Sequence, residues 1–160
     1  MMTEIFIKKI SDNKGIIHKI CNIYCNTSED KMDMMQEITL QLWKSFPDFQ
    51  EKAKFSTWMY RIALNTAITD IRKSKRSPIV EALSEKQVEL VEKEDIPALD
   101  ESVNKLYKAI ARLNDIEKAI ILLYLEKRTY FEIGEIAGIS EKNVSVKIVR
   151  IKKKLKELLS

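Results

Sequence analysis

The chain has few residues that interrupt helices or build disulfide and metal sites: its 160 residues include three Gly, three Pro, two Cys and one His. So few Gly and Pro exclude a fold built on many tight turns and favour long helices. Two cysteines exclude a disulfide framework. No apolar run approaches the roughly 18 to 20 residues that span a bilayer, and the first residues lack the pattern of a signal peptide. We therefore expect an all-α, cytoplasmic protein without membrane insertion.

The cysteines lie one helical turn apart, and with His18 they form the pattern H-x-x-C-x-x-x-C at His18, Cys21 and Cys25. Two interpretations are open, a metal site and a packed or half-buried helix face. A structural zinc site normally takes four ligands, and the chain has no further His or Cys to supply the fourth. We favour the packed face and expect no metal or other cofactor.

Charge is distributed unevenly around a formal net charge of only +4. Residues 1–76 carry 13 Lys+Arg against 9 Asp+Glu, residues 77–102 carry 2 against 8, and residues 103–160 carry 13 against 7. This pattern predicts two basic domains, 1–76 and 103–160, joined by an acidic linker at 77–102.

The stretch from Lys54 to Arg76, KFSTWMYRIALNTAITDIRKSKR, predicts one long helix, with Ser56 and Thr57 suited to cap its start. At 100° per residue, one face is apolar: Tyr60, Ala63, Leu64, Ala67 and Ile71. The other face carries Trp58, Arg61, Asn65, Thr69, Arg72 and Arg76. Guanidinium groups, an amide and an indole suit phosphates, base edges and unpaired bases. From the residues alone, a nucleic-acid surface and a solvated helix face are equally supported.

An earlier helix is predicted from a cap at Thr27 or Ser28 to about Phe46, before Pro47. Its inward face is expected to hold Met35, Ile38, Thr39, Leu42 and Phe46, and its outward face Asp33, Gln36, Glu37, Leu40 and Lys44. A leucine among acidic and amide groups suits a protein-binding patch, although a solvated face with one apolar residue is the commoner arrangement. Before this helix, the chain is expected to open with a helix, or with two short ones that meet near Gly15. Its apolar residues are Ile16, Ile17, Ile20, Ile23 and Tyr24.

The C-terminal part predicts two helices, around Val103–Leu113 and after Asn114-Asp115, followed by a helix-turn-helix in residues 129–155. Its first helix should end at Gly138 and its second should begin at a Ser140 cap. The second helix should bury Val144, Ile148, Ile151 and Leu155. Its outward side carries Asn143, Lys147, Arg150 and Lys154, with Val146 and Lys153 beside them. The G-I-S turn favours DNA binding over an ordinary amphipathic helix.

Three stretches in this order resemble the sigma factors of bacterial RNA polymerase, specifically the extracytoplasmic-function (ECF) group. They are DMMQEITLQLW, FSTWMYRIALNTAITDIRKSKR and TYFEIGEIAGISEKNVSVKIVRIKKKLKELL. The first resembles the polymerase-binding helix of the family, the second its −10 reading and melting segment, and the third its −35 reading helix-turn-helix. Two positions depart from the family pattern: Ser145-Val146, where a basic residue and Ser are common, and Gly134, where Ala is usual. We expect Gly134 to loosen the packing between the two helices by about 1 kcal/mol.

The resemblance implies three binding surfaces. It implies that core polymerase binds Asp33, Gln36, Glu37, Leu40 and Trp43. It implies that −10 DNA and the opened non-template strand bind Phe49, Lys52, Lys54, Phe55, Ser56, Thr57, Trp58, Arg61, Asn65, Arg72 and Arg76, with the loop from Phe49 to Thr57 forming a pocket for an extruded base. It implies that −35 duplex DNA binds Lys142, Asn143, Ser145, Val146, Lys147, Arg150 and Lys154.

The resulting hypothesis is a non-enzymatic initiation factor whose partners are core polymerase and promoter DNA, with an anti-sigma factor as a further candidate. A stand-alone helix-turn-helix regulator is the alternative, but it leaves the Trp58 face and Leu40 without a role. An enzyme is the third hypothesis. The sequence opposes it, because the chain lacks a phosphate-binding glycine loop, a nucleophile–base pair and a second histidine.

Overall fold

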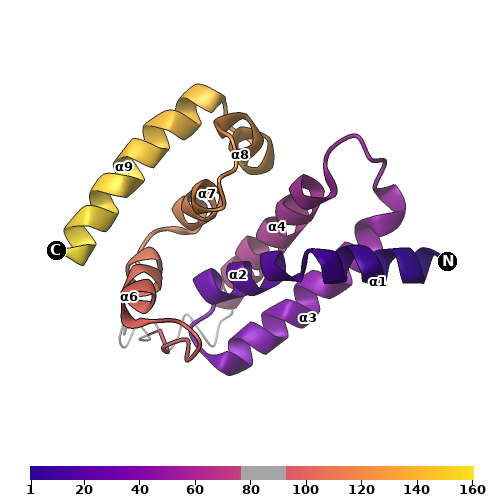
Figure 1. Cartoon of the computed structure of the whole chain (residues 1–160), viewed down its shortest axis with the longest axis horizontal. Helices are drawn as coiled ribbons and strands as arrows, with labels where there is room; N and C mark the ends of the chain where they lie inside the picture. Colours follow the sequence, from indigo (N-terminus) through magenta and orange to yellow (C-terminus); the bar gives the residue numbers. More distant parts are fainter. Residues whose placement is uncertain (77–92) are drawn as a thin grey trace.

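The computed structural model describes residues 1–76 and 93–160, in which all regular structure is helical (Figure 1). The N-terminal module consists of α1 (Met2–Asp12), α2 (Lys14–Tyr24), α3 (Ser28–Ser45), a 3₁₀ turn (Phe46–Asp48) and α4 (Phe55–Arg76). The C-terminal module consists of α6 (Glu101–Ile110), α7 (Asp115–Leu125), α8 (Tyr130–Ala137) and α9 (Glu141–Leu159). The predicted all-α, two-domain class is confirmed. No described helix combines length with enough apolar character to span a bilayer.

Local polar contacts set the helix ends of the N-terminal module, and the predicted cap of α4 is wrong. Two short helices meet near Gly15, as one of the two alternatives predicted: the break lies at Asn13, whose amide donates to the Lys9 carbonyl at 2.9 Å. Thr27, one of the two residues predicted to cap α3, does so by accepting a hydrogen bond from the Asp30 N–H at 3.1 Å. Helix α4 already begins at Phe55, so Ser56 and Thr57 lie inside its first turn and do not cap it.

The C-terminal module has the predicted helix-turn-helix. Asn114 and Thr129 each form a capping box at the start of α7 and α8, satisfying backbone N–H groups that a helix start leaves without partners. Gly138 ends α8 in the left-handed conformation at φ 76°, which a glycine adopts without strain. Ser140 then caps α9 through the Asn143 N–H at 3.2 Å.

Gly134 is required for this turn, so the expectation that it loosens the helix pair is wrong. A Cβ on Gly134 would lie 2.6 Å from the Ile139 carbonyl oxygen, closer than any real contact. The Gly134 carbonyl also accepts from the N–H groups of Gly138 and Ile139, at 2.8 and 3.1 Å. The glycine therefore lets the turn pass directly against α8.

We expect Gly134→Ala to destabilise the chain by about 1 to 3 kcal/mol, because the backbone of the turn must move to admit a methyl group. Gly15→Ala is the matched control, since nothing lies within 4 Å of a Cβ at that exposed helical position. The control should be neutral or stabilise by up to about 1 kcal/mol. Urea unfolding measures both, and equal stabilities for the two variants would contradict the role of Gly134.

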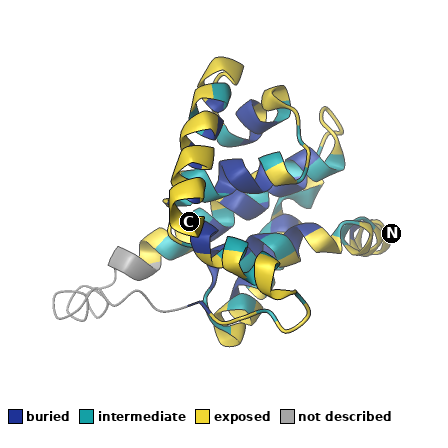
Figure 2. Ribbon diagram, turned by 60° about the vertical axis from the view of Figure 1, so that its left-hand side comes forward, coloured by how far each residue is buried: buried dark blue, intermediate teal, exposed yellow. Residues whose placement is uncertain are grey.

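One connected set of buried residues runs through both modules (Figure 2). The predicted stripes supply much of it: Tyr60, Ala63, Leu64 and Ala67 of α4 and Val144, Ile148, Ile151 and Leu155 of α9 are buried. On α3 the buried residues are Met34, Ile38 and Leu42, while the predicted Met35 is half-buried. The modules thus share one core.

The modules meet where α2 packs on α7 and α4 packs on α8. Polar contacts accompany this packing. The Tyr24 hydroxyl donates to the Asp115 carbonyl at 2.6 Å, and Lys19 pairs with Glu126 at 2.7 Å. In Figure 1, α9 runs along the outer edge of the C-terminal module, away from α1 and α3.

Most of the predicted linker, residues 77–92, lies outside the described residues. The structure describes its end, from residue 93 onward. The Glu94 N–H donates to the Asn26 carbonyl at 3.1 Å, and its carboxylate accepts from the Ser28 N–H at 3.2 Å. Asp95 pairs with Lys108 of α6 at 2.6 Å. The end of the acidic segment is therefore bound to both modules.

Candidate nucleic-acid and protein-binding surfaces

The outward face of α3 carries the residues predicted to bind a protein partner. Asp33, Gln36 and Leu40 are exposed, with Leu40 at 44%, and Trp43 is 39% exposed. Glu37 is half-buried and accepts a hydrogen bond from the Gln41 amide at 3.0 Å. An exposed leucine and an exposed tryptophan beside carboxylates make a surface suited to an apolar partner with a basic rim.

Helix α1 extends this surface into a groove, which the sequence did not predict. The groove has a volume of about 560 Å³ and is lined mostly by apolar side chains: Thr3, Phe6, Ile7, Met35, Gln36, Thr39, Leu40 and Trp43. Phe6 is buried and its ring centre lies 5.0 Å from that of Trp43, so α1 is fixed against α3. The feature of the sequence that could have indicated the groove is the apolar pair Phe6 and Ile7 in an amphipathic N-terminal helix.

The polar face of α4 presents several of the predicted nucleic-acid residues. Arg61, Asn65 and Arg72 are exposed, as are Lys52 and Lys54 in the preceding loop. Ser56 is half-buried, whereas Thr57 is only 3% exposed and cannot reach a ligand in this arrangement. The Arg76 side chain lies outside the described residues.

Trp58 lies in an aromatic cluster rather than alone on the surface. Its ring centre is 5.0 Å from Phe49, 5.3 Å from Phe55 and 6.2 Å from Phe46. These spacings are typical of packed aromatic pairs. The loop before α4 is therefore folded onto its first turn by ring contacts, and the indole is half-buried.

The outward face of α9 is open to solvent. Lys142, Asn143, Val146, Arg150 and Lys154 are exposed, and Ser145 and Lys147 are half-exposed. Ser140 and the buried stripe below them fix the rotation of the helix. A basic helix face presented in this way fits the major groove of duplex DNA.

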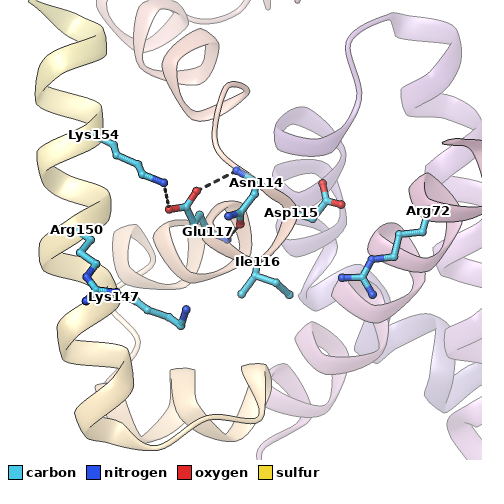
Figure 3. Close-up of a pocket in the computed structure, with 8 residues that line it drawn as sticks. All are labelled: Arg72, Asn114, Asp115, Ile116, Glu117, Lys147, Arg150 and Lys154. Atoms are coloured by element: carbon cyan, nitrogen blue, oxygen red, sulfur yellow. Dashed lines mark hydrogen bonds and ion pairs between the residues drawn. The ribbon is translucent and has the colours of Figure 1, made fainter. Parts of the chain in front are cut away.

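Cationic side chains from both modules border one hollow of about 430 Å³ (Figure 3). Arg72 of α4 lies on one side and Lys147, Arg150 and Lys154 of α9 on the other. Lys154 pairs with Glu117 at 2.7 Å. The packing of the two modules thus brings Arg72, predicted to bind the −10 region, close to the residues predicted to bind the −35 region.

The His18, Cys21 and Cys25 side chains do not converge. His18 is exposed, whereas both thiols are buried in the core. Burial raises the pKa of Cys21 to about 12 and that of Cys25 to about 11, which keeps both thiols protonated and poor ligands for a metal. Among the described residues, no three His, Cys, Asp or Glu side chains are grouped to hold a metal ion.

Both modules match known families. Residues 10–77 match Sigma-70 region 2, and residues 104–155 match Sigma-70, region 4. The first match contains α2, α3 and α4, and the second contains α7 and α8 with most of α6 and α9. A stand-alone helix-turn-helix regulator is not favoured, since it leaves the region 2 match unexplained.

Relatives and solved structures agree with these matches. The chain is 29% identical over 157 residues to the ECF RNA polymerase sigma factor SigW of Bacillus subtilis, covering 91% of this chain and 84% of SigW. It is 25% identical to the RNA polymerase sigma factor SigV of the same organism, covering 88% and 82%.

Two solved structures share the fold. The sigma factor RpoE in complex with the anti-sigma factor NepR from Bartonella quintana superposes with a TM-score of 0.80 at 17% identity, covering 96% of both chains. CnrH in complex with the cytosolic domain of CnrY superposes with a TM-score of 0.60 at 18% identity, covering 98% of this chain and 88% of that one. With regions 2 and 4 in order and an ECF relative that matches 91% of this chain, the chain belongs to the ECF sigma factors of RNA polymerase.

Proposed function

We propose that this sigma factor docks on core polymerase through α3, holds the −10 region and the opened non-template strand on α4, and reads the −35 region with α9. The observation that carries the proposal is the presence on one chain of three exposed surfaces with different chemistry. The α3 groove is apolar with acidic neighbours, the α4 face is polar and cationic, and the α9 face is basic. Each has the chemistry of a different ligand.

The proposed partners follow from these surfaces. Core polymerase and promoter DNA are those of the family, and one of the two solved structures that share the fold is a complex with an anti-sigma factor, which supports an anti-sigma factor as a third partner. A protein that works on polymerase acts in the cytoplasm. We propose no catalytic step for the chain itself, because its role is to position polymerase and DNA.

Reconstitution with purified core polymerase tests the proposal. The chain should co-elute with core polymerase in gel filtration and should direct transcripts that start at defined sites on a genomic DNA library. Core polymerase alone should give no such starts. A chain that binds duplex DNA alone, does not co-elute and gives no defined starts would be a stand-alone regulator, and the proposal would be wrong.

A further inference from the structure

A lysine is buried where the end of the acidic segment meets both modules. Lys93 is 7% exposed, and its Nζ atom has no hydrogen-bond partner among the described residues. Buried polar groups without partners are rare in folded proteins, because removing a charge from water without an acceptor is costly. None of the three binding surfaces uses this amine, so its chemistry is a separate question.

Backbone contacts on both sides fix the segment that carries Lys93. The next residue, Glu94, donates its N–H to the Asn26 carbonyl at 3.1 Å, in the turn between α2 and α3. Two residues further, the Ile96 N–H donates to the Asn104 side chain of α6 at 2.9 Å. The segment is therefore bound to the N-terminal module on one side and to α6 on the other.

The groups around the Lys93 amine are aromatic or positively charged. The centre of the Tyr107 ring on α6 lies 5.8 Å from Nζ. Burial lowers the pKa of the amine to about 7, the charges of Lys31 on α3 and Lys118 on α7 lower it as well, and Cys25 at the end of α2 raises it. A large part of the amine is therefore neutral near pH 7. A neutral amine beside other cations is a nucleophile.

The two neighbouring cations favour one kind of product. A Lys93 side chain that gained a negative charge would be attracted by Lys31 and Lys118, whereas its ammonium form is repelled by both. The Lys118 amine lies 5.6 Å from the centre of the Tyr24 ring, a contact that holds its charge at this place. A neutral acyl group on Lys93 would remove the repulsion without supplying the attraction.

We propose that Lys93 is a modification site for carbon dioxide, which it takes up reversibly as a carbamate. The amine nitrogen gives its electron pair to the carbon of carbon dioxide, so that a C–N bond forms and the electrons of one C=O π bond move onto oxygen. The nitrogen then releases one proton to water. The balance needs no oxidant, reductant or further reagent. Carbon dioxide is uncharged and has three atoms, so it can enter when the short non-helical segment around Lys93 opens locally.

The carbamate reverses the sign of the charge at this junction and thereby stabilises the folded chain. In the unfolded chain a lysine is protonated near neutral pH and reacts little with carbon dioxide. The folded chain therefore takes up more carbon dioxide than the unfolded chain, and mass action shifts the equilibrium toward folding. This inference goes beyond the proposed function and does not depend on binding to polymerase or DNA.

Carbon-13 NMR of the full chain tests the proposal. The chain is equilibrated near neutral pH with ¹³C-labelled bicarbonate, which supplies dissolved carbon dioxide, and a carbamate gives a carbonyl signal separate from that of bicarbonate. The wild type should show a carbamate signal that is missing from Lys93→Met. The α-amine of Met1 can give a second signal, which the variant keeps. Trapping with triethyloxonium converts a carbamate into a stable ester, and peptide mass spectrometry then locates it on Lys93.

Two further variants and a stability measurement separate a built site from general lysine chemistry. Lys105→Met is the matched control, because Lys105 is 68% exposed and pairs with exposed Glu101; it should keep the Lys93 signal. Lys31→Gln should lower the modified fraction about threefold, because it removes one of the two attracting charges. Replacing chloride by bicarbonate at equal ionic strength should raise the folding equilibrium constant of the wild type about threefold and leave that of Lys93→Met unchanged.

Three outcomes would overturn the inference. They are equal carbamate signals from the wild type and Lys93→Met, trapped ester spread over exposed lysines instead of Lys93, and no carbamate other than that of the α-amine. Trapping on the wild type needs no variant, so it decides the question even if Lys93→Met does not fold. Circular dichroism checks the fold of each variant.

Discussion

Lys93→Met should stabilise the folded chain by about 3 kcal/mol at pH 6, an unusual result because most substitutions of buried residues destabilise. Lys93 is 7% exposed, and its amine has no hydrogen-bond partner among the described residues. Its nearest compensation is the Tyr107 ring, whose centre lies 5.8 Å away. A buried ammonium without an acceptor costs several kcal/mol, and methionine fills similar space without that cost.

Neighbouring positive charges add to the free-energy cost of burying the Lys93 ammonium. Burial is the main reason that its pKa falls to about 7, and the positive charges of Lys31 on α3 and Lys118 on α7 lower it further. Cys25, at the end of α2, raises the pKa of Lys93. The group therefore lies at the junction of both modules, facing two like charges.

The sign of the pH dependence follows from this lowered pKa. Between pH 7 and about 10.5 the unfolded chain holds a proton on Lys93 that the folded chain has released, so stability rises with pH across this range. Below pH 7 both states are protonated and the full cost is present. From pH 6 to pH 8.5 the wild type should gain about 2 kcal/mol from this group. Above that range the buried thiols lower the stability as the pH rises. Their pKa values are raised, so the folded chain keeps thiol protons that the unfolded chain loses.

Urea unfolding at pH 6 and pH 8.5 measures the effect. The stabilisation by Lys93→Met should be about 2 kcal/mol smaller at pH 8.5, because the wild-type amine is then largely neutral. Lys105→Met is the control, since that lysine of α6 is 68% exposed and pairs with exposed Glu101. It should change stability by less than about 0.5 kcal/mol at both pH values. A destabilised Lys93→Met would mean that the amine has an acceptor.

Much of the fold was predictable because it depends on contacts between neighbours in the sequence. The Thr27 and Ser140 caps and the buried stripe of α9 follow from residue type and spacing alone. The predicted caps Ser56 and Thr57 were wrong because packing of Phe55 against Phe49 and Trp58 makes α4 begin at Phe55, before both of them. Tertiary contacts there outweigh the local capping preference.

The features that the sequence could not show depend on approaches between distant segments. Gly134 looked like a packing defect because nothing in its own helix shows that the Ile139 carbonyl lies beside it. Lys93 looked like one charge in a polar linker, since its burial requires both modules to be in place. The hydrogen bonds from Arg61 to the Glu135 carbonyl and from Arg128 to Ser56 likewise join residues more than 70 positions apart.

The structure also changes how the acidic linker should be tested. The resemblance to ECF sigma factors implies that the acidic linker at 77–102 passes through a basic channel of polymerase. Of the glutamates that carry its charge, Glu85, Glu89 and Glu92 lie outside the described residues. Glu94 holds the Asn26–Ser28 turn, so removing its charge would also weaken the contact between the modules. A charge-removal variant should therefore change the first three glutamates to glutamine and keep Glu94.

The α3 groove is where a single substitution should have the largest effect on polymerase binding. Leu40→Asp should weaken binding to core polymerase by about 30-fold or more, because it places a charge in the apolar part of the proposed interface. The residue is 44% exposed and not part of the core, so the fold should remain intact. Competition with a labelled wild-type chain for core polymerase measures the loss.

The groove makes a sharper prediction for α1, where two exposed isoleucines lie two positions apart. Ile7 lines the groove with Leu40 and Trp43, whereas Ile5 does not. They are exposed to similar extents, 59% and 51%, so aspartate at either position should cost the fold equally little. Ile7→Asp should weaken polymerase binding by about tenfold, and Ile5→Asp by less than about twofold. Equal losses would mean that α1 acts only through general surface charge, and no loss from either would confine the interface to α3.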